Sequence, residues 1–474
     1  MKKFVTDLIL QKLGHEPTPG QSEMIDQLAD FVASPDSDHL FLLKGYAGTG
    51  KTATISALVK VLDELKIKFI LLAPTGRAAK VLSRQSGKPA STIHKKIYRQ
   101  MAVGDGSSRF SLDRNMARNA IFVVDEASMI SNLPQDHNVF GSGYLLSDLI
   151  EYVSGGYLCK LIISGDTAQL PPVGLSVSPA LDKEELSLFG MEVVTQELKE
   201  VVRQSADSGI LKNATTIRNR VMGDAPSGFW PLQLNGFKDV VRIGGDALIE
   251  EIGNSYGKMG MEETIVITRS NKRANIFNEG IRRTILFQED KIAKGDLLMI
   301  VKNNYHWSKQ LEEVDFIANG DIAEIIRIRK QEERYGFNFA NVVLRLIDYQ
   351  DIEIECKILL ETLTAEAPAL TSEENKRLFE AISEDYLEIR NKRERWKKIR
   401  EDPYFNAIQV KYSYAVTCHK AQGGQWKTVF LDHGYLTAEM IDREFLRWFY
   451  TAFTRAEERL FLVNFHKEFF DETL

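Results

Sequence analysis

The sequence predicts an α/β protein built from two lobes, the second of which carries a β-rich insertion. The N-terminal part of the chain alternates short apolar runs with helix-like segments, and a glycine-rich loop follows the first run. A second group of apolar runs is split by a segment of strand-like pattern. With 474 residues, the chain is also too long for one hydrophobic core, so several domains are expected.

Four short runs predict the strands of the first lobe. They are Leu40–Leu43, Phe69–Leu72, Ile121–Val124 and Leu161–Ile163. Each is apolar at successive positions, which is typical of a parallel sheet covered by helices on both faces. Loops that bind ligands then belong at the carboxyl ends of these strands.

The second lobe is predicted from three runs that are widely separated in the chain. The run Thr264–Ile267 predicts a strand that ends at a polar loop. Thr428–Leu431 and Leu460–Val463 supply further strands only after a long interruption. The interruption is therefore expected to be an insertion in this lobe.

The insertion lies between about Gly295 and Gln409 and has two parts. The first part carries the strand-like runs Asp321–Ile328, Asn341–Ile347 and Asp351–Ile358. These runs indicate a small β-barrel. The second part, Ser372–Arg400, is a long helical pattern that ends in the basic run Arg390–Arg400, with Trp396 inside it. The favoured interpretation of this run is a solvated helix face, and the alternative is contact with nucleic acid.

A polar stretch from Lys95 to Arg118 interrupts the first lobe. It contains the turn-rich sequence Val103–Ser108. The flanking residues that would pair across a hairpin are Tyr98, Met101, Phe110 and Leu112. A small hairpin and a surface loop both remain open on this pattern.

Composition and charge exclude several classes of protein. The chain is 44% hydrophobic and 27% charged, no apolar run has the length of a membrane span, and the Met-Lys-Lys start lacks the apolar core of a signal peptide. Cys159, Cys356 and Cys418 are far apart and fit a reducing compartment. The net charge of −6 argues against a whole-surface nucleic-acid binder but leaves room for a basic groove. We therefore expect no membrane association and a cytoplasmic location.

The segment Gly45-Tyr-Ala-Gly-Thr-Gly-Lys-Thr52 predicts a phosphate-binding loop, because it follows an apolar run and precedes a helix-like segment. Glycines let backbone amides turn inward around a polyphosphate. The lysine then reaches the β- and γ-phosphates, and the threonine hydroxyl ligates Mg²⁺. A glycine turn beside a surface lysine is the disfavoured alternative. The residues expected to hold the nucleotide are Gly45, Gly48, Thr49, Gly50, Lys51 and Thr52.

Acidic and amide residues follow the next two predicted strands. Asp125 and Glu126 come directly after Ile121–Val124, where the first would hold Mg²⁺ and the second would accept a proton from the attacking water. Gln169, in the loop Gly165–Gly174, is expected to sense the γ-phosphate.

Two arginines outside the first lobe are candidates for stabilising the transition state. Arg203 follows the first lobe, and Arg455 lies in Tyr450–Glu457. An arginine that enters from a second lobe would make closure around ATP a mechanical step. A generic surface arginine is an equal alternative for each on chemistry alone.

Taken in order along the chain, these segments resemble the motifs of superfamily 1 helicases. Ala73–Ala79 is similar to motif Ia, Ala90–His94 to the DNA-contacting segment after it, and Thr417–Gly424 to motif V. The residues within these motifs are similar to those of superfamily 1B, the RecD, Dda and Pif-type group. The order of domains and insertions is most similar to that of Dda-like enzymes. The resemblance implies that Gln21 reads adenine and that Gln422 and Gly423 also contact the nucleotide. The DNA contacts that it implies are Pro74, Thr75, Thr92, His94, Thr417 and His419.

The resemblance also implies a domain plan of two RecA-like lobes. Lobe 1A would comprise residues 1–95 and 118–195, with a pin hairpin at 96–117. Lobe 2A would comprise residues 196–297 and 408–474, and an SH3-like 2B barrel with a helical tower would occupy 298–407.

Two positions depart from the family pattern. Dda-like enzymes carry a histidine where this chain has Gly76, and related enzymes usually carry a serine where it has Ala421. Either change would remove a DNA contact. His94 and His419 also have an alternative interpretation, as packed structural histidines.

The function implied is an ATP- and Mg²⁺-dependent DNA helicase that moves 5′ to 3′ on single-stranded DNA and acts in replication, recombination or repair. We expect a monomeric, nucleoid-associated protein of bacterial or phage type. Its expected partners are single-stranded DNA, duplex junctions, and a single-strand-binding or recombination protein. Two alternatives remain. One is a translocase or a RecD-like subunit of a recombination complex that has no unwinding activity, and the other is a module that uses ATP only as a switch.

Overall fold

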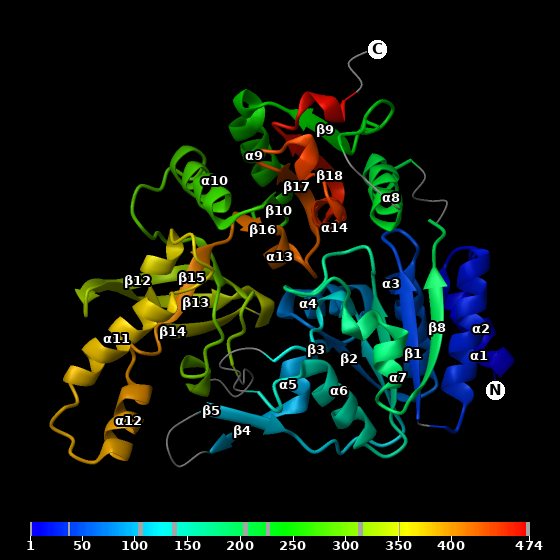
Figure 1. The fold of residues 1–474 in the computed structure, drawn as a ribbon, viewed down its shortest axis with the longest axis horizontal. Helices are drawn as coiled ribbons and strands as arrows, with labels where there is room; N and C mark the ends of the chain where they lie inside the picture. Colours follow the sequence, from blue (N-terminus) through cyan, green and yellow to red (C-terminus); the bar gives the residue numbers. More distant parts are fainter. Residues whose placement is uncertain are drawn as a thin grey trace.

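The computed structural model describes residues 2–36, 38–102, 108–134, 140–201, 207–223, 228–310, 316–349 and 351–470. This part of the chain forms two open sheets flanked by helices, a closed β-barrel and a two-stranded hairpin (Figure 1). The predicted fold class, two α/β lobes with a hairpin and a barrel inserted, is confirmed.

The first lobe is built on a six-stranded parallel sheet in the order β3-β2-β6-β7-β1-β8. Its four inner strands are those predicted from the apolar runs. Sequence patterns missed the edge strands, because β3 is very short and β8 is only partly buried. The strands are β1 (His39–Gly45), β2 (Lys68–Ala73), β3 (Ala90–Thr92), β6 (Ala120–Val124), β7 (Lys160–Gly165) and β8 (Glu192–Leu198).

Helices cover both faces of this sheet, as its apolar strands require. One face packs against a core that includes Val5, Ile25 and Leu58, and the other against a core that includes Ile97 and Leu149. The helices are α1 (Lys2–Leu13), α2 (Pro19–Ala33), α3 (Lys51–Glu64), α4 (Gly76–Ser86), α5 (Ile93–Ile97), α6 (Leu145–Ser154) and α7 (Lys183–Ser187).

A hairpin replaces the polar stretch that interrupts the first lobe. Strands β4 (Tyr98–Ala102) and β5 (Ser108–Leu112) pair antiparallel, which confirms the hairpin over the surface loop. The turn at 103–107 lies outside the described residues. Phe110 of β5 packs its ring 4.8 Å from Phe140 of the first lobe and 4.8 Å from Tyr305, which belongs to the insertion. The hairpin is therefore held from two sides.

The second lobe has a parallel sheet of five strands in the order β16-β10-β17-β18-β9. The strands are β9 (Val240–Ile243), β10 (Thr264–Thr268), β16 (Ala415–Thr417), β17 (Trp426–Asp432) and β18 (Ala456–Val463). The helices around it are α8 (Gly209–Met222), α9 (Gly245–Met259), α10 (Asn271–Thr284), α13 (Cys418–Ala421) and α14 (Arg443–Phe453). Helix α14 is aromatic along its buried side and faces the first lobe.

The insertion folds as a closed barrel, as its strand-like runs predicted. Pairing is antiparallel except between its last two strands, which are parallel. The strands are β11 (Leu297–Ile300), β12 (Ile322–Arg334), β13 (Phe337–Leu346), β14 (Ile352–Leu359) and β15 (Ile408–Tyr412).

The prediction of one long helix over Ser372–Arg400 is wrong. The segment forms two helices, α11 (Ser372–Glu384) and α12 (Lys392–Glu401). Asn391 starts the second helix, because its side chain accepts hydrogen bonds from the first free backbone amides. Trp396 of the basic run stacks on Phe379 with ring centroids 5.0 Å apart and remains 44% exposed.

A buried ion pair joins the barrel to the second lobe. Arg282 of α10 donates two hydrogen bonds of 2.9 Å to the carboxylate of Asp296, which directly precedes β11. Tyr414 donates a third, at 3.0 Å. The barrel and the second lobe also share one hydrophobic core, which includes Ile281 and Leu298. These two parts are therefore expected to behave as one body.

We predict that Arg282→Met destabilises the protein by about 3–5 kcal/mol, because it leaves the Asp296 carboxylate buried without its cation. Urea unfolding monitored by circular dichroism measures this loss. The matched control is Arg283→Met, whose partner Glu279 is exposed, and it should cost no more than about 0.5 kcal/mol. Equal urea midpoints for the two variants would contradict this account of the junction.

Candidate functional site

The glycine-rich loop joins β1 to α3 at the carboxyl edge of the first sheet. Gly48 and Gly50 have φ angles of 76° and 83°, a region that favours glycine. The Lys51 ammonium donates hydrogen bonds to the carbonyls of Gly45 and Tyr46 inside the loop. A Cβ atom at Gly45 would lie 2.9 Å from Lys51 Cγ, so the folded lysine also requires a glycine there.

The predicted acids lie at the end of β6, beside this loop. Burial raises the pKa of Asp125 to about 6; the Glu126 charge adds to the rise, while Ser164 and the Lys51 cation oppose it. Glu126 has a left-handed backbone conformation with a φ angle of 55°. Such a conformation is uncommon for a residue with a side chain and is found at active sites.

Thr52 and Asp125 together fit a hard divalent cation, since a hydroxyl and a carboxylate are ligands that Mg²⁺ accepts. In the described ranges, no group of three or more His, Cys, Asp or Glu side chains is placed to hold a metal ion. Mg²⁺ usually keeps several waters and binds substrate phosphates besides one or two protein ligands, which suits a site with these two residues.

Gln21 and Gln422, two predicted nucleotide contacts, bond to backbone carbonyls, whereas Gln169, the predicted γ-phosphate sensor, bonds to a side chain. Gln21 is fully buried, and its amide donates a 3.0 Å hydrogen bond to the carbonyl of Thr49 in the phosphate loop. Gln169 is also buried, and its side-chain oxygen accepts a weak 3.5 Å hydrogen bond from Ser128. Gln422, from the second lobe, donates a 2.8 Å hydrogen bond to the carbonyl of Leu170.

Helix α14 of the second lobe docks onto the loop that follows β7. Arg447 donates hydrogen bonds to the carbonyls of Thr167 (2.8 Å) and Gln169 (3.0 Å). The Thr451 hydroxyl accepts one from the amide of Leu170 (2.9 Å). Sequence reasoning missed both residues. The available signal was two polar side chains on a helix that is otherwise mostly aromatic and aliphatic.

Tyr450 links the phosphate loop to the same docking surface. Its buried hydroxyl donates a 2.7 Å hydrogen bond to Asp166 and accepts a 2.8 Å hydrogen bond from the amide of Ala47. Tyr450 begins the segment that carries Arg455, but a hydroxyl with partners almost 300 or more positions away has no local sequence signal.

Arg455 enters from the second lobe and reaches Glu126 of the first, with Nη1 3.8 Å from Oε1. It is 2% exposed and donates hydrogen bonds to the carbonyls of Gly424 and Thr451. A surface arginine is therefore excluded at this position. Arg203, the other predicted arginine, lies outside the described residues.

Four predicted DNA contacts line one groove between the first lobe and the barrel. The groove has a volume of about 500 Å³ and includes Pro74, Thr75, Thr92 and His94. Lys302 of the insertion lines the opposite side and was not predicted. Burial lowers the pKa of His94 to about 4, so the ring is neutral at pH 7.

The other two predicted contacts lie on the second lobe. Thr417 lines a small cavity with Lys420 and Asn271, and His419 is exposed. Thr417 lies at the end of β16, as Thr75 follows the end of β2 in the first lobe. One candidate of each lobe, Thr75 in the first and Thr417 in the second, therefore lies at the carboxyl end of a strand.

The departure at Gly76 has a steric cause. A Cβ atom on Gly76 would lie 2.8 Å from Asp321 Oδ1. The other carboxylate oxygen of Asp321 accepts hydrogen bonds from Tyr349 and from the amide of Ala318, which hold it in place. The barrel therefore occupies the space that a histidine at this position would need.

None of the helices in the described ranges combines the length and apolarity needed to cross a bilayer.

We predict that Tyr450→Phe lowers the free energy of unfolding by about 1–3 kcal/mol, because Asp166 and the Ala47 amide each lose a buried partner. Thermal unfolding measures the change. Tyr435→Phe is the matched control, since Tyr435 is 81% exposed and its hydroxyl can bond to water. A Tyr450→Phe protein as stable as the control would show that this hydroxyl does not hold the lobes together.

Comparison with known proteins gives two matched domain families and several relatives. Residues 16–226 match an AAA domain, and residues 412–463 match a UvrD-like helicase C-terminal domain. The ATP-dependent RecD2 DNA helicase of Deinococcus radiodurans is 26% identical over 93% of this chain, which spans only 48% of that protein. The ATP-dependent DNA helicase dda of Enterobacteria phage T4 is 26% identical over 82% of this chain and 87% of its own length.

Among solved structures, a Pif1 helicase from Bacteroides in complex with ADP-AlF3 and single-stranded DNA superposes with a TM-score of 0.46 at 14% identity. The superposition covers 95% of this chain and 94% of that one. The domain matches and the two helicase relatives confirm the predicted resemblance of this chain to superfamily 1B helicases.

Proposed function

We propose that the protein is an ATP-driven DNA helicase that moves 5′ to 3′ along single-stranded DNA and unwinds duplex ahead of it. The observation that carries this proposal is that Arg455 of the second lobe meets Glu126 of the first beside the phosphate loop. An ATPase whose catalytic groups come from two lobes changes the contact between those lobes as it turns over.

The residues divide the chemistry of ATP hydrolysis among them. Glu126 takes the proton of the attacking water, which reaches the γ-phosphorus as the bond to the leaving ADP oxygen breaks. Lys51 exchanges its loop carbonyls for phosphate oxygens, and Arg455 faces the charge that develops on the transferred group. A Mg²⁺ ion held by Thr52 and Asp125 would neutralise charge on the phosphates.

The docking of α14 provides a route from chemistry to motion. Gln169, the proposed γ-phosphate sensor, lies in the loop whose carbonyls bond to Arg447. A change in that loop therefore alters donors and acceptors that belong to the other lobe. Loss of phosphate after hydrolysis would weaken this set of bonds and let the lobes separate.

The groove between the first lobe and the barrel is the proposed strand path. Hydroxyl groups at strand ends, together with Lys302, suit the sugar–phosphate backbone and carry no base preference. Strands β4 and β5, which Phe110 braces, lie beside this groove and belong to the proposed pin domain at 96–117. The barrel and its two helices are the proposed 2B domain at 298–407. A pin whose base is packed through Phe110 favours unwinding over translocation alone.

The cellular setting that we propose is DNA replication, recombination or repair. The RecD2 relative is named an ATP-dependent DNA helicase, and this chain spans 48% of it. A role as a RecD-like subunit is therefore kept as the second possibility, and the unwinding assay below decides between the two.

The direct test is strand separation with purified protein, ATP and Mg²⁺ on duplexes with a 5′ or a 3′ single-stranded tail. Unwinding of the 5′-tailed duplex alone is expected. Unwinding that needs a 3′ tail would refute the polarity, and no unwinding of either substrate despite DNA-stimulated ATPase would favour the translocase or subunit role. Parallel assays with RNA strands define the nucleic acid.

Glu126→Gln tests the proposed base, because an amide keeps the size of the side chain and cannot accept the proton. We expect the turnover number for ATP to fall about 10²- to 10⁴-fold while ATP affinity stays within about threefold. Phosphate release and fluorescent-nucleotide binding measure the two quantities. Glu23→Gln, on the exposed face of α2, is the charge-matched control. Normal turnover in Glu126→Gln would assign the base to another residue.

A further inference from the structure

We propose that Arg77 of α4, packed on Trp426 of β17, is a positioning residue that makes the placement of Arg455 depend on the bound DNA strand. This inference rests on the proposed function. It adds a route between the strand path and the nucleotide site that does not pass through the phosphate loop.

The first step of the route is the start of α4. Pro74, Thr75 and Gly76 line the groove that we propose as the strand path. The Thr75 hydroxyl accepts a 3.2 Å hydrogen bond from the Ala78 amide and so caps α4. Arg77 belongs to the first turn of this helix. A strand that binds at the cap therefore acts on the turn that carries Arg77.

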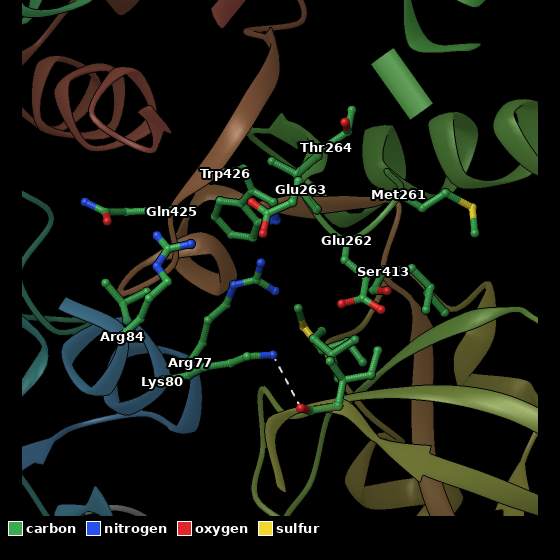
Figure 2. A pocket seen from close by; sticks show the side chains of 16 residues that line it. Arg77, Lys80, Arg84, Met261, Glu262, Glu263, Thr264, Ser413, Gln425 and Trp426 are labelled. Carbon is green, nitrogen blue, oxygen red and sulfur yellow. Dashed lines mark hydrogen bonds between the residues drawn. The ribbon is translucent and has the colours of Figure 1, made fainter. Parts of the chain in front are cut away.

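The second step crosses to the other lobe. The guanidinium carbon of Arg77 lies 3.9 Å from the centre of the Trp426 ring, and Trp426 is only 2% exposed. Figure 2 shows the two side chains meeting at the wall of a small cavity between α4 and the second lobe. A cation over an indole face is strongest where water is excluded.

Gly424 makes this contact specific. A Cβ atom at that position would lie 2.5 Å from Trp426 Cη2 and 2.9 Å from Arg77 Cδ. Any side chain at position 424 would clash with both Trp426 and Arg77, so their packing requires a glycine there. The segment Gly424–Trp426 is thus seated directly against α4.

The third step runs from this segment to the catalytic arginine. The Trp426 amide donates a 2.9 Å hydrogen bond to the carbonyl of Arg455. Arg455 Nη1 in turn donates a 3.1 Å hydrogen bond to the carbonyl of Gly424. Both the backbone and the side chain of Arg455 are therefore attached to the segment that Arg77 holds.

Two further contacts connect α4 with the same region of the second lobe. Arg84 pairs with Glu457 at 2.7 Å, and the Gln85 side chain bonds to Gln425 at 3.2 Å. The Arg84 and Glu457 side chains are 50% and 29% exposed, so solvent weakens their interaction. Arg84 offers a matched control, since it is an arginine on the same helix whose partner also belongs to the second lobe.

The experiment compares steady-state ATPase of the full chain with and without a single-stranded oligo(dT). For Arg77→Ala, basal turnover should stay within about twofold of wild type, and the stimulation by oligo(dT) should fall at least about fivefold, within the usual range of coupling between two sites. Oligo(dT) affinity by fluorescence anisotropy should be nearly unchanged. Arg84→Ala should retain most of the stimulation.

Variants of the partner residues make the test independent of one mutant. Trp426→Phe keeps a ring face and should retain stimulation, whereas Trp426→Ala should lose it. The double variant Arg77→Ala/Trp426→Ala should lose no more oligo(dT) stimulation than either single alanine variant, because both substitutions remove the same contact. Thermal unfolding of each variant checks that the lobes still fold.

The outcomes separate this inference from the proposed function. A wild-type protein with no DNA-stimulated ATPase would refute both. Stimulated wild type together with fully stimulated Arg77→Ala, or equal losses in Arg77→Ala and Arg84→Ala, would refute the route through Trp426 alone. Additive losses in the double variant would also refute it.

Discussion

The arrangement of the site depends on the docking of α14 against the loop that follows β7. Arg447, Tyr450 and Thr451 bond to that loop; the bonds of Tyr450 and Thr451 are buried, and those of Arg447 are partly buried. Buried polar groups need their partners, so these bonds hold one relative position of the two lobes rather than a range of positions. Arg455 reaches Glu126 only because this position is held.

The phosphate loop fits the same constraint. Lys51 bonds to carbonyls of its own loop, while the Ala47 amide is taken by Tyr450 of the other lobe. Rearranging the loop around a triphosphate therefore affects groups that belong to both lobes. Nucleotide binding and lobe position are coupled through shared hydrogen bonds, and no separate switch element is needed for that coupling.

Much of the fold and part of the site were predictable because their signals are local. The inner strands and the phosphate loop follow from apolar runs and a fixed glycine spacing. The break between α11 and α12 was missed because charged residues on both sides continue a helical pattern, and only Asn391 marks the new start. Tyr450 and Arg447 were missed because their partners lie about 280 or more positions away. The clash that a side chain at position 76 would make with Asp321 likewise exists only in three dimensions.

The two interfaces of the barrel are unequal, and this difference decides which parts can move. Towards the second lobe, the barrel shares a hydrophobic core and the buried pair of Arg282 with Asp296. Towards the first lobe, Tyr305 and Phe316 pack against Phe110 and Phe140 at the edge of that lobe's core, and Lys80 donates a hydrogen bond to the carbonyl of Ile347. Separating the barrel from the second lobe would expose a large shared core and an ion pair, whereas separating it from the first lobe would expose the smaller aromatic cluster around Phe316. Lobe opening should therefore carry the barrel with the second lobe, so that the groove beside Thr75 widens in the same motion that withdraws Arg455 from Glu126.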